Sequence, residues 1–90
     1  MTEPVLRLRS DGLDWRIVDD EAVILDAERS AYNATNASGT VLWRRLHDGA
    51  TRSELVDALS TCFAIDRLLA EADVDAFLSD LRNRGLLIES

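Results

Sequence analysis

Residues 28–46 read ERSAYNATNASGTVLWRRL, and this stretch joins two halves of the chain that differ in character. Its first part, Ser30–Thr35, reads as a short strand. Asn36 follows, and an asparagine at this position can cap a helix by accepting a hydrogen bond from a backbone N–H of the first turn. Apolar residues then recur at helical spacing, at Val41, Leu42, Leu46 and, beside them, Trp43. The stretch therefore predicts a strand that passes directly into a capped helix.

Upstream of this stretch the sequence predicts a β-hairpin. Leu13–Val18 (LDWRIV) alternates apolar and polar residues, and Glu21–Ala27 (EAVILDA) returns after a short acidic turn at Asp19 and Asp20. With a third strand around Ser30–Ala34 the three segments form an antiparallel meander, which needs cover on one face to be stable. Residues 1–10 are expected to be a tail or, through the run VLRLR at residues 5–9, an extra strand.

Downstream the sequence predicts three helices. The first spans Ala37–His47 and ends near Gly49, the second begins at a capping box of Thr51 and Glu54, and the third runs from Asp66, a plausible cap, to Arg84. The apolar stripe expected on the third helix consists of Leu69, Ala72, Ala76, Phe77 and Leu81, widened by Val74 and Leu78. These patterns predict one α+β domain over residues 1–90, a three-stranded meander followed by three helices in a winged-helix-like arrangement.

The charge of the chain limits the partners that such a domain could have. Its 90 residues carry a formal net charge of -7, whereas nucleic-acid affinity depends mainly on Lys and Arg. A winged-helix DNA-binding regulator remains an alternative, in which the second and third helices would read the DNA. Their expected exposed residues have the wrong sign for phosphate; they are Glu54, Asp57, Glu71, Asp73, Asp75 and Asp80. A basic or neutral peptide would be a better partner.

No constellation of residues in the sequence points to catalysis, a metal site or a cofactor. His47 is the single histidine and is expected on the surface in the last turn of the first helix, and Cys62 is the single cysteine and is expected in the core. Gly39 is expected to permit close packing at a helix start, because no phosphate-binding glycine pattern surrounds it. With neither a signal sequence nor an apolar segment of membrane-spanning length recognisable, a cytoplasmic location is expected.

The remaining hypothesis is peptide recognition at an open sheet edge. The last strand of the meander, Ser30–Ala34, has one neighbour in sequence, so its other edge would offer unpaired N–H and C=O groups to an extended peptide. If the third helix lay beside that edge, Val74, Phe77, Leu78 and Leu81 would form the far wall of a groove. The same edge could also pair with a second copy of the chain to give a homodimer.

The order of these motifs, over about Trp15–Ile88, resembles the PqqD-like family. This family contains the leader-peptide recognition elements of pathways that make ribosomally synthesised and post-translationally modified peptides (RiPPs). The matching segments are VILDAERSAYNATN, NASGTVLWRRLHDGAT, SELVDAL and DVDAFLSDLRNRGLL. One departure is Thr35, where the family usually has a large aliphatic residue, and it bears on the packing between the third strand and the first helix.

The resemblance implies a three-stranded sheet followed by three helices, and a non-enzymatic role in binding a precursor's leader segment. The leader would add antiparallel to the third strand, in the cleft against the third helix. The residues implied for backbone pairing are Arg29, Ser30, Ala31, Tyr32, Asn33 and Ala34. Those implied for side-chain pockets are Asp73, Val74, Phe77, Leu78 and Leu81.

The resemblance also implies a pathway and a partner enzyme. As a free-standing chain, the protein is similar to the recognition proteins of lasso-peptide clusters, which deliver the leader to a separate protease. A second setting for the family is the biosynthesis of pyrroloquinoline quinone. The expected partners are therefore a precursor leader and a leader peptidase or other modifying enzyme, without nucleic acid, membrane or cofactor.

Overall fold

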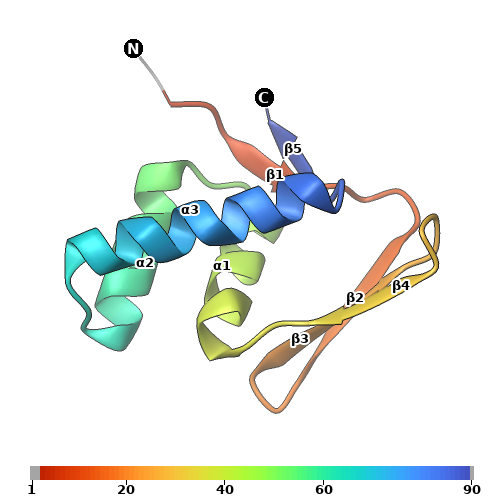
Figure 1. Ribbon diagram of the computed structural model, residues 1–90, viewed down its shortest axis with the longest axis horizontal. Helices are drawn as coiled ribbons and strands as arrows, with labels where there is room; N and C mark the ends of the chain where they lie inside the picture. Colours follow the sequence, from red (N-terminus) through yellow and green to blue (C-terminus); the bar gives the residue numbers. More distant parts are fainter. Residues whose placement is uncertain (1–2, 90) are drawn as a thin grey trace.

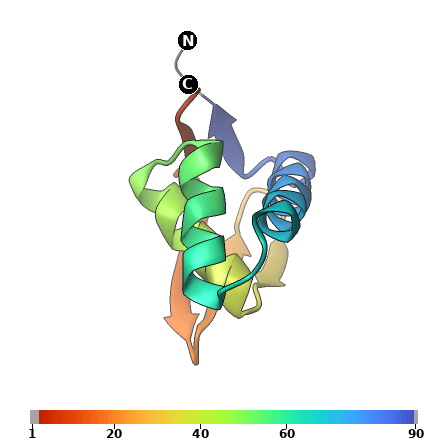
Figure 2. The ribbon, with the colours of Figure 1, turned by 90° about the vertical axis from the view of Figure 1, so that its left-hand side faces the viewer.

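The computed structural model of the chain describes residues 3–89 (Figure 1). The elements in order are β1 (Leu6–Leu8), β2 (Leu13–Val18), β3 (Glu21–Asp26), β4 (Ala31–Ala34), α1 (Ala37–Asp48), α2 (Arg52–Phe63), α3 (Arg67–Asn83) and β5 (Leu87–Glu89). The prediction of an α+β fold with a three-stranded meander and three helices is confirmed. Figures 1 and 2 show the three helices together on one side of the molecule and the β2–β3–β4 sheet on the other.

The main sheet has the strand order β2–β3–β4, with both pairs antiparallel. Its register places Trp15 opposite Ile24, and Ile24 opposite Asn33. The turn between β2 and β3 is formed by Asp19 and Asp20, both with positive φ (50° and 65°), the backbone twist that two-residue hairpins favour. The predicted hairpin and its acidic turn are therefore confirmed.

The two faces of this sheet have different environments. The inner face meets the helices through residues that include Trp15 and the buried Ile24, and the Trp15 ring stands edge-on to Trp43 of α1 with 6.0 Å between ring centroids. The outer face carries Leu25 and Tyr32 side by side, both exposed.

A second, two-stranded sheet joins the two ends of the chain. β1 pairs antiparallel with β5, with Leu6 opposite Glu89 and Leu8 opposite Leu87. The possible extra strand at residues 5–9 is thus present as β1, and the C-terminal segment expected to pack as a tail is a strand. Leu6 and Leu86 are buried in the core, so this small sheet closes one end of the domain.

Local capping signals fix the helix boundaries. The Asn36 side chain accepts the Gly39 N–H (2.9 Å) at the start of α1, and Gly49 ends that helix with φ 93°. Thr51 and Glu54 form the predicted capping box, with reciprocal bonds of 2.8 and 3.2 Å. Asp66 precedes α3 but makes no side-chain capping bond, so its predicted capping role is wrong.

The buried face of α3 differs from the predicted stripe. The helix buries Ala70, Val74, Leu78 and Leu81, whereas three residues expected in the stripe, Leu69, Ala72 and Ala76, are exposed. Ala70, fully buried on the helix that packs against α2, is small enough for the two helices to approach closely there. The buried stripe therefore starts one residue later than predicted.

The last turn of α2 also differs from the sequence-based expectation. Cys62 is exposed rather than in the core, as are its neighbours in residues 61–64. The residues that α2 buries all lie earlier in the helix; they are Leu55, Val56, Ala58 and Leu59. None of the helices within residues 3–89 combines the length and apolar character needed to cross a membrane.

Candidate functional site

The open edge of β4 is the first component of the candidate site. Within residues 3–89, β4 pairs with β3 and has no strand on its other side. The Thr35 N–H donates to the Ala22 carbonyl (3.0 Å), and in an antiparallel ladder the bonded residues alternate. Ala31 and Asn33 therefore direct their backbone groups to β3, while Tyr32 and Ala34 direct theirs to the open edge. This edge can pair with an extended chain.

A pocket of about 190 Å³ lies between β4 and α3. Its floor is apolar and includes the buried side chains of Ile24 and Leu81, and the half-buried ring of Phe77 forms part of its wall. The polar residues of its lining are Asn33, Thr35, Asn36, Asp80 and Arg84. The pocket therefore combines an apolar floor with a polar rim beside the open edge of β4.

A second pocket of about 350 Å³ continues along α3 and shares Asn36, Gly39, Phe77 and Asp80 with the first. It adds Asp73 and Ala76 of α3. Because the two pockets share lining residues, they form one depression, and "the groove" below means the lining of both. A Cβ added to Gly39 would lie 3.3 Å from the Phe77 ring and 3.0 Å from the Thr35 Cβ. The close packing predicted for Gly39 is therefore confirmed.

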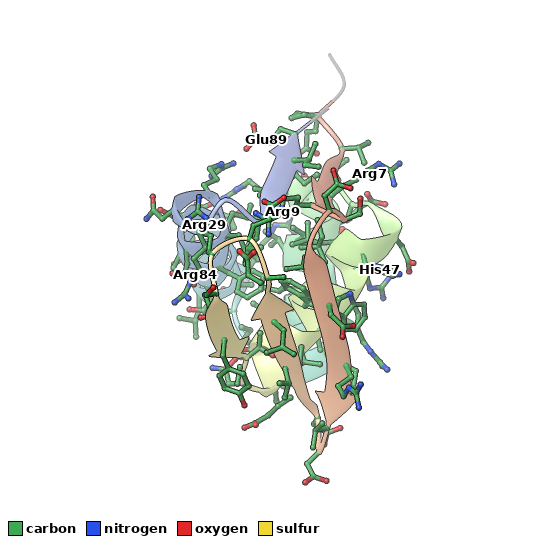
Figure 3. The ribbon with its side chains drawn as sticks, turned by 90° about the vertical axis from the view of Figure 1, so that its right-hand side faces the viewer. Arg7, Arg9, Arg29, His47, Arg84 and Glu89 are labelled. Carbon is green, nitrogen blue, oxygen red and sulfur yellow. The ribbon has the colours of Figure 1, made fainter. Side chains whose placement is uncertain are left out.

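Two arginines connect the C-terminal end of α3 with β4 and the turn before it. Arg84 donates to the Asn33 side chain on β4, and its Nε donates to Asp80 Oδ2 (3.0 Å). Arg29 Nη1 donates to the Asn83 carbonyl (3.5 Å). Figure 3 shows Arg29 and Arg84 one above the other where β4 begins. Two guanidinium groups therefore lie at this end of the groove, Arg84 in its lining and paired with Asp80, and Arg29 outside the lining.

Two threonine hydroxyls fix the junction between β4 and α1. Thr35 Oγ1 and Thr40 Oγ1 lie 2.7 Å apart, and both accept the Ala22 N–H, at 2.9 and 3.1 Å. Thr40 Oγ1 also lies 2.7 Å from the Asp20 carbonyl, which can accept its hydroxyl proton. The hydroxyl of Thr35, the residue noted above as a departure, thus has hydrogen-bonding partners.

A buried ion pair supports the turn that leads into β4. Asp26, 2% exposed, accepts from Arg9 Nη2 (2.5 Å) and from the Arg29 N–H (3.4 Å). Burial raises the pKa of the Asp26 carboxyl, but the hydrogen bonds to it and the charge of Arg9 together lower it more, so that this pKa lies below its usual range. The carboxylate is therefore held ionised under the start of the edge strand.

A second ion pair holds α3 against the start of α2. Arg52 donates to both carboxylate oxygens of Asp75, at 2.7 and 3.0 Å. The hydrogen bond from Arg52 lowers the pKa of Asp75 below its usual range, against the smaller opposing effect of burial. Since Arg52 and Asp75 line neither pocket of the groove, this pair leaves the groove free.

The structure brings together part of the predicted site. The four residues of β4, Ala31–Ala34, form the open edge, and Asp73, Phe77 and Leu81 line the groove. Whether these residues bind a peptide stays a prediction.

Four other predicted residues lie outside both the groove lining and β4. Val74 and Leu78 are 0% and 2% exposed, because they belong to the face of α3 that packs into the core, and they line neither pocket of the groove. Arg29 and Ser30 precede the strand, and Ser30 has φ 52°, which is incompatible with extended pairing.

Sequence reasoning missed several groove residues on α3 and α1. Asp80 and Arg84 lie three and seven residues after Phe77, so helical spacing alone could have placed them on its face, whereas Ala76 was assigned to the buried stripe. Asn36 and Gly39 were interpreted only as helix-start residues, and no local signal connected them with α3.

The described residues hold no group of three or more His, Cys, Asp or Glu side chains that could bind a metal ion. His47 is exposed, as predicted, and its ring stands edge-on to Trp15 with 5.1 Å between centroids. It therefore contacts the sheet and not the groove (Figure 3).

Comparisons with known proteins agree with this geometry. The sequence model of the family described as "Coenzyme PQQ synthesis protein D (PqqD)" matches residues 21–87. No curated protein sequence matches the chain.

Three solved structures are similar to it. TbiB1 in complex with the TbiA(beta) leader peptide is 33% identical, with a TM-score of 0.82 over 90% of this chain and 93% of that one. A lasso peptide synthetase B1 complexed with the leader peptide is 25% identical, with a TM-score of 0.80 over 92% and 96% of the two chains. The PqqD truncation of Methylobacterium extorquens PqqCD, described as a RiPP recognition element, shares the fold at 21% identity, with a TM-score of 0.71 over 93% and 88%.

Proposed function

The chain belongs to the PqqD family, and from this we propose that it binds the leader segment of a RiPP precursor by adding it as a strand to β4. The observation that carries the proposal is the open edge of β4 beside the groove along α3. The leader peptides in the two similar complexes, those of TbiB1 and the synthetase B1, support it.

The register of β4 defines how such a peptide would lie. The N–H and C=O groups of Tyr32 and Ala34 face the open edge, so an antiparallel peptide would exchange backbone bonds with these two residues. Peptide residues opposite Asn33 and Thr35 would send their side chains toward α3, because directly opposed residues share a face. Every second side chain of the peptide would therefore enter the groove.

Two kinds of interaction would supply the affinity. Each backbone bond contributes about 0.5–1.5 kcal/mol net, and burying one apolar side chain against Phe77 and Leu81 contributes about 1.5–3 kcal/mol. Part of this gain offsets the cost of ordering a flexible peptide. The apolar contact selects the peptide, while the backbone bonds hold whatever extended chain the groove accepts.

We further propose that the protein catalyses no step itself and presents the precursor to a partner enzyme, a leader peptidase of lasso type being favoured. The lasso assignment draws on the similarity to the lasso peptide synthetase B1. A DNA-binding role is disfavoured because α2 and α3 expose acidic side chains, among them Asp57 and Asp73.

Selection from a phage-displayed library of random 12-residue peptides, followed by calorimetry with a selected peptide, tests the proposal. Phe77→Asp should abolish binding, because it places a carboxylate in the wall of the first pocket. Since Phe77 is half-buried, Ala76→Arg provides a second variant at an exposed position of the groove. Circular dichroism verifies that each variant is folded. Unchanged affinity in both folded variants, or no peptide selected by the wild-type protein, would sink the proposal.

A further inference from the structure

Among the residues that line the two pockets of the groove, Arg84 is the one with a basic side chain. We propose that it reads a carboxylate of the bound peptide, an Asp or Glu two residues after the apolar residue that occupies the first pocket; this rests on the proposed function. In an antiparallel peptide, the residue opposite Thr35 points into that pocket, and the residue two positions later lies opposite Asn33. Asn33 is the residue that Arg84 already contacts.

The position of the Arg84 guanidinium is set by its neighbours. Arg84 is the C-terminal capping residue of α3, and Asp80 one turn earlier holds its Nε at 3.0 Å. Two of its five N–H donors are thus used, on Asp80 and Asn33, and the other three have no partner in residues 3–89. Asp80 is therefore a positioning residue, and the free donors can form a bidentate pair with a carboxylate.

The charges around Arg84 favour an anion at this end of the groove. Arg29 brings a second guanidinium to the same end, on the Asn83 carbonyl. Asp80 and the C-terminal end of the α3 dipole oppose an anion, but Asp80 is already paired with Arg84. A neutral amide on the peptide could also accept from Arg84, yet a charge-assisted bond is roughly twice as strong.

In a chain with a net charge of -7, the guanidinium of Arg84 would also affect the register in which a peptide binds. Backbone pairing alone fixes register weakly, because any residue of an extended peptide can form the same bonds. Further along α3 the second pocket adds Asp73, where a peptide carboxylate would meet like charge. A peptide with one acidic residue is therefore held in the register that places this residue at Arg84, so that Arg84 acts on register as well as on affinity.

Peptide selection against wild-type protein and an Arg84→Glu variant tests the proposal, with the random 12-residue phage library as the probe. The wild-type protein should enrich Asp or Glu two positions after an apolar residue, and the variant should enrich Lys or Arg at that position. Fluorescence anisotropy then compares a selected peptide with its acid-to-amide analogue. The wild-type protein should bind the analogue about tenfold more weakly, whereas Arg84→Gln should bind both peptides equally.

Arg82→Gln is the matched control. Arg82 lies in the last turn of the same helix but pairs with Glu89 (2.6 Å) and does not line the groove, so this variant should keep the tenfold preference. Selected peptides that need Phe77 for binding but show no acidic preference would overturn the role of Arg84 and leave the proposed function standing. If Arg84→Gln still preferred the acidic peptide over its amide analogue, the role of Arg84 would likewise be overturned while the proposed function stood. A failure of every selection would instead count against the proposed function.

Discussion

Replacing Ala34 by proline tests strand addition while the large apolar residues of the groove, Phe77 and Leu81, stay unchanged. The Ala34 N–H faces the open edge of β4, because Thr35 and Asn33 on either side make the bonds to β3. Proline is tolerated on edge strands when its missing N–H would face solvent. The substitution therefore removes the Ala34 N–H that would donate to the incoming peptide, and it removes no hydrogen bond between β3 and β4.

The expected loss of affinity follows from the pairing geometry. One backbone bond contributes about 1 kcal/mol net. The proline ring also occupies space that a strand about 4.8 Å away would fill, which weakens the neighbouring bonds at Tyr32 by about another 1 kcal/mol. The total of about 2 kcal/mol corresponds to a roughly 30-fold increase in Kd. Because the ladder to β3 stays intact, the free energy of unfolding should change by less than about 1 kcal/mol.

Calorimetry with a display-selected peptide measures the Kd, and urea unfolding measures the free energy of unfolding. Ala34→Ser is the matched control, since serine keeps the N–H and is of similar size, and its Kd should stay within about twofold of wild type. If Ala34→Pro folds normally and also binds within twofold of wild type, the peptide does not pair with β4, and the reasoning from the open edge is refuted.

Two further predictions concern the elements that hold β4 in place. Thr35→Val removes one of the two hydroxyls that accept the Ala22 N–H and should lower the free energy of unfolding by about 1 kcal/mol, measured by urea titration; equal or higher stability would show that the hydroxyl pair contributes nothing. The pKa of Asp26 is lowered on folding, so its contribution to stability is complete above the unfolded pKa of about 3.9 and is lost as pH falls through the folded value. Thermal unfolding between about pH 6 and pH 2 should therefore show a steeper loss of Tm for the wild-type protein than for Asp26→Asn, and parallel curves would contradict this assignment.

The elements that were predictable from sequence are those with local signals. The capping box of Thr51 and Glu54, the glycine that ends α1 and the acidic hairpin turn each depend on residues close in the chain. The face of α3 was not predictable in this way. Its alanines lie on several sides, so more than one stripe has helical spacing, and packing against α2 decides which stripe is buried.

The candidate site likewise contains residues that local sequence patterns could predict and residues that they could not. Its strand was predicted within one residue on the basis of local pattern, and Phe77 and Leu81 were correctly placed beside it. The contact of Arg84 with Asn33 joins residues 51 positions apart, and no pattern in either segment indicates it. Val74 and Leu78 were assigned to the groove because hydrophobic periodicity does not distinguish a core face from a wall that a ligand touches.

The small sheet at the ends of the chain has a consequence for how the protein is made. β1 precedes the three helices and β5 follows them, so the β1–β5 pairing forms only after residues 87–89 have left the ribosome, and until then Leu6 can pair only with Ala50. Closing so long a loop carries a high entropic cost and is expected late in folding. Leu6 and Leu86 belong to the same core as residues of α1 and α3, so this domain is complete only after β5 has been synthesised.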